Sequence, residues 1–217
     1  MGLELRRRYT FTAEMRDDAC LDFANTLSWR GRAAPAETLA GAGALVRWLA
    51  GSAGLAGKVV GEIESWTQAH PKQAGTLLAE AVVLRETLYR IFRALADGEA
   101  APNRDLVALN QALAAAPPRR RIAPAAPGYG WQIGPAAISM PTLLAPVLWS
   151  AGDLLASDRR RRVRLCANEQ CLWLFLDESK AGTRRWCNMA SCGNRAKARR
   201  HYQRSRPRSE PGWGRRA

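Results

Sequence analysis

Four cysteines near the C-terminal end restrict the fold of this chain more than any other feature. They form two C-x4-C pairs with fifteen residues between the pairs: Cys166, Cys171, Cys187 and Cys192. Two cysteine pairs joined by a short loop supply the four sulfur ligands of a tetrahedral metal ion, at about 2.3 Å each for zinc. Four thiolates leave no open coordination position, so the pattern predicts one structural Zn²⁺ with no catalytic role.

The cysteine pattern alone leaves three alternatives to zinc open. An iron–sulfur cluster also takes four cysteines, and the thiols could instead form disulfides or stay unliganded. Disulfides fit poorly with an N-terminus in which arginines 6–8 are not followed by the apolar stretch of an export signal. We therefore favour zinc and expect a soluble, cytoplasmic protein without a membrane span. The fifth cysteine, Cys20, lies in an apolar run and is expected to be buried.

Positive charge is concentrated in the same part of the chain. Residues 159–217 contain 17 Lys and Arg against 4 Asp and Glu, a net charge of +13, whereas residues 1–158 contain 16 against 15. A concentrated positive field attracts polyanions, although a solvated basic face can also serve solubility alone. We expect a nearly neutral body (1–158), a basic finger module (159–206) and a flexible tail (207–217).

The finger module has few apolar residues, so zinc is expected to supply much of its folding free energy. Chelation should therefore melt this module first, while the body keeps its own core. The aromatic residues of the module suit either base stacking or packing around the metal. We favour packing for Trp173, Phe175 and Trp186.

A basic helix is expected directly after the last cysteine. Gly193 would allow a positive φ beside the ligand, Asn194 would cap the helix, and residues 196–204 would form it. Cations occupy two opposite faces of this helix, and the pattern does not choose between them. The candidate nucleic-acid contacts are Arg184, Arg185, Arg195, Lys197, Arg199, Arg200 and Arg204.

Hydrophobic periodicity predicts a mainly α-helical body with a small β element. The β element should comprise an edge strand within residues 6–12 and a hairpin of residues 119–125 and 129–133. The sequence has no H-E-x-x-H, G-x-S-x-G or phosphate-binding glycine motif, so we expect no enzymatic activity. Helices are expected at residues 18–29, 37–49, 59–68, 77–95, 106–116 and 142–156.

One polar stripe in the first expected helix is a candidate site. Asp22, Asn25, Thr26 and Arg30 would share one helical face. Such a stripe lines either a small-ligand pocket or a buried network that joins this helix to the hairpin. We favour the network, because buried polar groups are usually satisfied within the protein. A ligand bound there would reach the finger through the connection at residues 153–163.

The cysteine-rich segment resembles the CGNR zinc finger. The similarity covers residues 164–166, 173–179, 185–189 and 192–197, and includes an F-x-D-x-S motif that begins at Phe175. Residues 22–26 are similar to the D-F-x-N-T signature of the ABATE domain, which usually precedes this finger. The resemblance implies a stress-induced transcription regulator of bacterial type, whose finger binds zinc and DNA.

Three classes of function are compatible with these features. The first is a zinc-dependent DNA-binding transcription regulator, with the basic finger on phosphates and the body as a candidate sensor of a small-molecule effector. The second is a zinc-stabilised adaptor for RNA or an acidic protein. The third is an enzyme, for which the body offers no constellation of residues. We favour the first class; the sequence indicates neither the target nor the oligomeric state.

Overall fold

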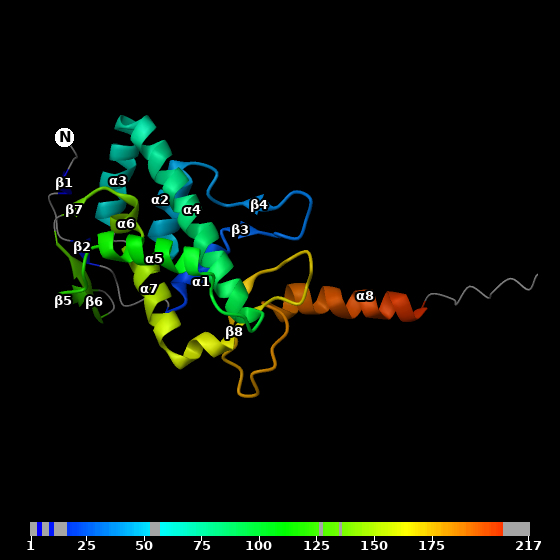
Figure 1. The fold of residues 1–217 in the computed structure, drawn as a ribbon. Helices are drawn as coiled ribbons and strands as arrows, with labels where there is room; N and C mark the ends of the chain where they lie inside the picture. Colours follow the sequence, from blue (N-terminus) through cyan, green and yellow to red (C-terminus); the bar gives the residue numbers. More distant parts are fainter. Residues whose placement is uncertain are drawn as a thin grey trace, which may run out of the picture.

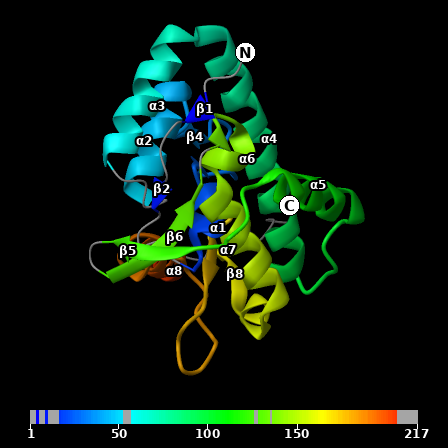
Figure 2. The same ribbon diagram turned by 90° about the vertical axis from the view of Figure 1, so that its left-hand side faces the viewer.

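Helix α4 (Pro71–Ala96) is the element against which most of the structure packs. Its buried side, which includes Leu84, Leu88 and Phe92, contacts α1, α2, α3, α5 and α6 as well as β8 and β9 of the cysteine-rich segment. Figures 1 and 2 show α4 beside these elements from two directions. The expected fold class, mainly α-helical with a small β element, is confirmed.

The computed structural model describes residues 4–5, 9–10, 17–52, 57–125, 128–134 and 136–205. Besides α4, its helices are α1 (Ala19–Ala24), α2 (Ala42–Ser52), α3 (Gly57–Ala69), α5 (Asn103–Ala115), α6 (Met140–Leu143), α7 (Ala145–Ala156), the 3-10 turn η1 (Asp158–Arg162), the π-turn η2 (Met189–Gly193) and α8 (Asn194–Ser205). Its strands are β1 (Glu4–Leu5), β2 (Tyr9–Thr10), β3 (Leu27–Ser28), β4 (Ala36–Glu37), β5 (Ile122–Ala125), β6 (Gly128–Ile133), β7 (Ala136–Ala137), β8 (Val163–Leu165) and β9 (Leu174–Leu176). The tail expected at residues 207–217 lies outside the described residues.

The β element of the body is built on the expected hairpin. β5 and β6 pair antiparallel, with Ile122 opposite Trp131. β2 joins the other edge of β6, giving the order β2-β6-β5, and β1 pairs separately with β7. The predicted edge strand is thus confirmed at Tyr9–Thr10, whereas residues 6–8 and 11–12 lie outside the described residues.

The helix expected at residues 18–29 is shorter than predicted. α1 ends at Ala24, and residues 27–28 form β3, which pairs with β4. The backbone N–H of Asn25 still bonds to Leu21, but the side chain of Asn25 hydrogen-bonds to β9, 149 positions further along the chain. The helix ends here because of this long-range partner, which local periodicity does not reveal.

The other expected helices are present with shifted boundaries. Residues 37–41 are not helical: Glu37 lies in β4, where its carboxylate accepts hydrogen bonds from Leu39 N–H and the buried Arg85. α4 begins at Pro71 rather than residue 77, because proline is well suited to the first turn of a helix. Val83, expected on the buried face, is 65% exposed. Residues 142–156 form two helices, α6 and α7, that meet at Leu144.

The core of the body continues into the cysteine-rich segment. Val163, Leu174 and Leu176 of β8 and β9 belong to the same buried cluster as Phe23 of α1 and Leu88 of α4. A second, smaller cluster surrounds the cysteines. The expectation that the body has a core independent of the finger is therefore wrong, because strands of the finger form part of that core.

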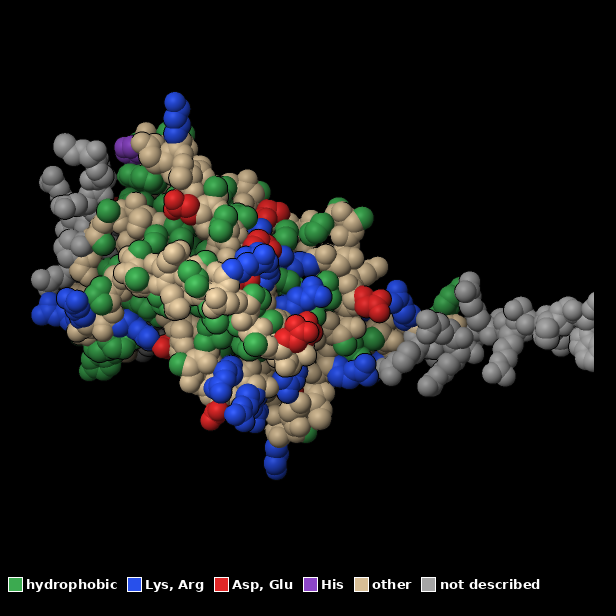
Figure 3. Space-filling view, viewed as in Figure 1, with side chains coloured by type: hydrophobic (Ala, Val, Ile, Leu, Met, Phe, Trp, Pro, Cys, Tyr) green, Lys and Arg blue, Asp and Glu red, His purple; other side chains and the backbone are tan. Residues whose placement is uncertain are grey.

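On the face shown in Figure 3, acidic and basic side chains are scattered among apolar ones. An apolar groove of about 330 Å³ lies between α4 and α5, lined by residues that include Val83, Leu84, Ala112 and Met140. Among the described helices, none combines the length and the apolar character that crossing a bilayer requires.

Candidate metal centre and basic surface

The first cysteine pair lies at the closed end of a β-hairpin. β8 and β9 pair antiparallel, with Val163 opposite Leu176. Cys166 extends this ladder, because its N–H donates to the carbonyl of Trp173 at 2.9 Å. The backbone of the first ligand is thereby fixed by the sheet.

Asn168 shapes the loop between Cys166 and Cys171. Its carbonyl accepts hydrogen bonds from the N–H groups of Cys171 (2.7 Å) and Leu172 (3.2 Å), and its Oδ1 accepts one from Gln170 N–H (3.1 Å). Leu172 has a φ of 53°, which a branched residue adopts only when its surroundings impose it. This turn brings the second sulfur back beside the first.

The second cysteine pair lies in the turn that starts α8. Asn188 precedes η2, and its Oδ1 accepts a hydrogen bond from Ser191 N–H at 3.0 Å. The chain then passes from Cys192 directly into α8. The last ligand and the basic helix therefore belong to one continuous helical segment.

Two details of this turn differ from the expectation. Gly193 has no positive φ; a Cβ there would lie 2.6 Å from Met189 Sδ, so the methionine side chain would have to shift. Asn194 does not cap the helix but is its first residue, with φ −66° and ψ −39°, and the side chain of Asn188 caps the preceding turn η2. Asparagine directly after Cys187 is a cap signal that the sequence could have disclosed.

The four sulfurs fit one tetrahedral metal ion. All four Sγ atoms lie within 4.8 Å of one another. Cys171 and Cys187 are 3.7 Å apart, and Cys187 and Cys192 are 3.9 Å apart. A tetrahedron with Zn–S bonds of about 2.3 Å has edges of about 3.8 Å. These distances exceed a disulfide bond of about 2 Å and leave no room for several iron atoms.

The surroundings of the sulfurs also suit a cation. Hydrogen bonds from the thiols of Cys171 and Cys187 lower the pKa of Cys166 to about 2, and the bond to Cys166 raises the pKa of Cys171 to about 12. Thiolates at this spacing repel one another unless a metal neutralises them, so binding of the ion releases protons. Asn168 Nδ2 lies 3.5 Å from Cys192 Sγ as a supporting donor.

Asp177 closes the long loop between the two pairs. Its carboxylate is fully buried and accepts hydrogen bonds from Ser179 Oγ (2.5 Å), Ser179 N–H (3.0 Å) and Arg184 N–H (2.9 Å). The bond from Ser179 lowers the pKa of Asp177. Phe175, the first residue of the F-x-D-x-S motif, is buried against the cysteines. This motif is thus structural.

The aromatic residues pack around the metal site as expected. Phe175, Trp173 and Trp186 all belong to the small cluster that contains the cysteines. The same cluster includes a tryptophan that no sequence motif marks, Trp29, from the segment between β3 and β4. Trp29 is therefore a residue of the body that lies at the metal site.

Residues 25–32 of the body, here called the contact segment, dock directly on the finger. Asn25 pairs through its side chain with both backbone groups of Leu174. The N–H of Gly31 donates to Gln170 O at 3.3 Å, and a Cβ at Gly31 would lie 1.7 Å from the carbonyl oxygen of Glu169. From α4, Tyr89 adds a hydrogen bond of 3.0 Å to Leu172 O. The contact segment thus holds the first cysteine loop.

The polar stripe is divided among several internal contacts. Buried Asn25 binds β9, and Thr26 Oγ1 donates to Phe23 O at 2.8 Å. Arg30 pairs with Glu86 at 2.8 Å and lies over the ring of Tyr89. Asp22 is half-buried. This describes the internal network we favoured, but it joins α1 to the finger and α4 instead of the hairpin; a ligand pocket on these residues stays a prediction.

Arginines of the finger, among them the candidate contact Arg184, also have structural partners. Arg184 lies over Phe175 and donates to the carbonyls of Trp186 and Cys187. Arg159 bridges Asp17 of the body and Glu178 of the finger at 2.7 and 3.0 Å. These arginines hold the finger together and attach it to the body. Arg185 is exposed and stacks on Trp186 at 5.4 Å.

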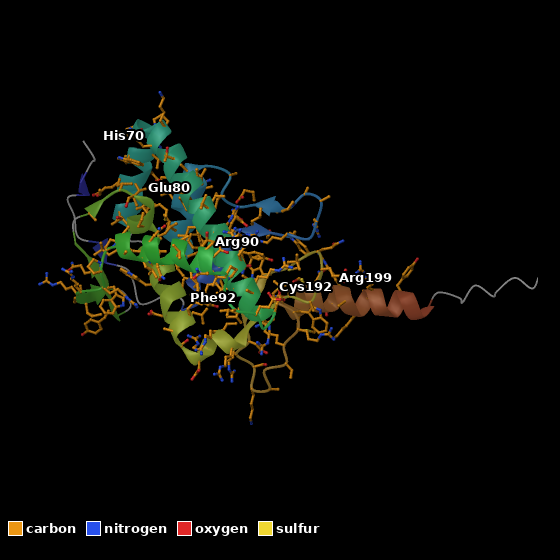
Figure 4. All side chains as sticks on the ribbon, in the orientation of Figure 1. His70, Glu80, Arg90, Phe92, Cys192 and Arg199 are labelled. Atoms are coloured by element: carbon orange, nitrogen blue, oxygen red, sulfur yellow. The ribbon has the colours of Figure 1, made fainter. Side chains whose placement is uncertain are left out.

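Helix α8 extends away from the body (Figure 1). Arg195, Lys197 and Arg199 are exposed, and Tyr202 is 64% exposed. Arg195 lies with its guanidinium carbon 4.8 Å from the ring of Trp29. Figure 4 places Cys192 where the helix begins and Arg199 further out along it. The side chains of Arg200 and Arg204 lie outside the described part.

The fold and the sulfur cluster define an α-helical protein with one structural zinc site in a C-terminal four-cysteine finger. Residues 17–158 match the model of the ABATE family, described as "Putative stress-induced transcription regulator", and residues 162–205 match the CGNR zinc finger. The chain belongs to the ABATE family and carries a CGNR zinc finger. A search of curated proteins found no match.

Proposed function

We propose that this protein is a zinc-dependent transcription regulator that binds duplex DNA through α8 and the adjoining cysteine loops. The observation that carries the proposal is the attachment of α8. The helix leaves the metal site without a break at Cys192 and presents the exposed cations Arg195, Lys197 and Arg199. A basic helix that continues directly from a metal site fits the contacts that regulators make with DNA phosphates.

Zinc has a mechanical role in this proposal. It joins the hairpin that is embedded in the body to the turn that starts α8, since each cysteine pair comes from one of these parts. Loss of the metal would free α8 from the body. Binding to DNA would then be weaker, because the mobile helix loses conformational entropy when it becomes ordered on the duplex. The proposal assigns the protein no catalytic activity.

The first experiment selects from random duplex DNA with the zinc-loaded full chain. Cys192→Ser, which removes one ligand, is compared with Cys20→Ala, which removes a cysteine outside the cluster. We expect one enriched motif for the wild type and Cys20→Ala, and none for Cys192→Ser. If all three proteins retain DNA equally, the finger module binds DNA through its positive charge alone and the proposed function is contradicted.

A salt titration tests the phosphate contacts. Each phosphate neutralised contributes about −0.9 to the slope of log affinity against log salt, so six contacts would give a slope of about −5. Structured RNA and duplex DNA are included as competitors. Displacement by RNA alone would favour the adaptor, because an RNA-binding surface reads A-form shape and single strands.

A further inference from the structure

Two arginines from distant parts of the chain share one tryptophan ring. The guanidinium carbon of Arg32, from the contact segment, lies 3.8 Å from the ring centroid of Trp29. That of Arg195, from the first turn of α8, lies 4.8 Å from the same centroid. The two guanidinium carbons are therefore no more than about 8.6 Å apart, the sum of the two distances.

The tryptophan that carries them is held firmly. Trp29 packs against the cysteine cluster and has a φ of 56°, a conformation that costs free energy for a bulky residue. The N–H of Arg32 donates to Trp29 O at 2.9 Å, which closes a turn. Gly31, within this turn, lies against the backbone of Glu169 and Gln170. Body and finger together set the position of the ring.

Within the described part of the chain, neither cation pairs with a carboxylate. Arg30, Arg85 and Arg90 of the body each pair with a carboxylate at 2.6–2.8 Å. Among the residues that the structure describes, Arg32 and Arg195 have no such partner, and both are exposed. Two unpaired positive charges held this close repel each other, so an anion that contacts both is favoured.

Arg195, one of the two cations, lines a groove of suitable chemistry. A cavity of about 330 Å³ lies between the first cysteine loop and α8, and its walls include Arg195, Arg199, Arg185 and Trp186. Glu169 is the acidic side chain on its rim. Arg32 approaches this groove through Arg195, because the two guanidinium carbons are no more than about 8.6 Å apart. Arginines that surround a groove suit a row of phosphates better than a single carboxylate.

We propose that the N-terminal body supplies part of the DNA interface, with Arg32 as a phosphate contact and Trp29 as the residue that positions Arg32 beside Arg195. The inference rests on the proposed DNA binding and extends it. The interface is a composite surface of Arg32, Arg185, Arg195 and Arg199. The finger alone does not complete it.

The test uses the full zinc-loaded chain and a 20-base-pair duplex, with binding followed by fluorescence anisotropy over a salt series. Arg32→Gln is compared with Lys72→Gln, a loss of the same charge at the start of α4. That end of the molecule, marked by His70 in Figure 4, lies far from α8. We expect Arg32→Gln to weaken binding several-fold and reduce the salt slope by about 0.9, and Lys72→Gln to leave the slope unchanged.

Two further variants separate positioning from folding. Trp29→Leu should lower the salt slope by more than Arg32→Gln while zinc content stays at one ion per chain, and Trp29→Phe should restore most of the slope. Glu169→Gln should tighten binding, because it removes a negative charge from the groove.

The outcomes distinguish the two proposals. If the wild type binds DNA and Arg32→Gln has the slope of Lys72→Gln, the composite surface is refuted and the proposed function stands. If the zinc-loaded wild type does not bind duplex DNA at all, both are refuted. A Trp29→Leu protein that retains zinc and the full slope would contradict the positioning role.

Discussion

The side chain of Asn25 pairs with the backbone of Leu174 as a neighbouring strand would. Asn25 Nδ2 donates to Leu174 O at 2.8 Å, and Leu174 N–H donates to Asn25 Oδ1 at 3.0 Å. Both residues are buried. The asparagine of the D-F-x-N-T signature thus serves as the edge partner of β9, which links the two family regions of the chain through one amide.

Replacing this amide should destabilise the whole protein. Asn25→Asp keeps the shape but loses the donor to Leu174 O and buries a charge, and we expect a loss of about 2–4 kcal/mol in the free energy of unfolding. Urea denaturation followed by circular dichroism measures it. Lys72→Gln is the surface control. Ordinary surface substitutions change the free energy of unfolding by less than about 0.5 kcal/mol, and a loss of this size for Asn25→Asp would contradict the role of the pair.

Chelation should affect body and finger together. Because Val163, Leu174 and Leu176 lie in the core of the body, loss of zinc loosens strands on which that core depends. We expect a chelator to lower the melting temperature of a single transition, seen alike in the helical signal and in tryptophan fluorescence. If the melting temperature of the body stays the same after complete removal of zinc, the body and the finger are thermodynamically independent and this prediction is wrong.

Cys20 should make stability fall at high pH. Burial raises the pKa of this thiol from 9.0 to about 12, so the thiolate forms readily only on unfolding. Between pH 9 and 12 the unfolded state therefore binds fewer protons than the folded state, and stability decreases as pH rises. We expect wild type to lose about 1.4 kcal/mol per pH unit relative to Cys20→Ala in this window.

The measurement is the difference between the two proteins in urea denaturation from pH 8 to pH 11, where the zinc thiolates are common to both. Parallel stability curves would show that Cys20 titrates in the folded state. Alkylation gives a second readout: at low temperature Cys20 should react far more slowly than the four other cysteines of the chelated protein.

Gly31 should not tolerate a side chain. A Cβ would lie 1.7 Å from the carbonyl oxygen of Glu169, a backbone atom that cannot move aside without shifting the first cysteine loop. We expect Gly31→Ala to cost about 1–3 kcal/mol or more and to weaken zinc binding. Gly41→Ala, where no atom lies within 4 Å of the added carbon, is the matched control. Equal stabilities of the two variants would show that the contact segment does not dock as described.

Much of the fold and the whole ligand set could be predicted from local patterns. The spacing of Cys166, Cys171, Cys187 and Cys192 predicted the cluster, and apolar periodicity predicted most helices, including α4. The errors lie where a distant partner decides. Residues 25–28 favour a helix locally, yet they leave it to bind β9 and β4. Likewise, nothing in the sequence around Trp29 indicates that its ring faces Arg195.

The sequence by itself determined the metal, the basic character of the last helix and the mainly helical fold, because each depends on residues close together in the chain. Only the tertiary structure decided that the body packs against the finger, through Asn25, Trp29 and Gly31. The physical reason is that these contacts are backbone and ring interactions between segments far apart in the chain, 149 positions in the case of Asn25 and Leu174. Such contacts leave no period or motif, and they form only when the shared core brings the two segments together.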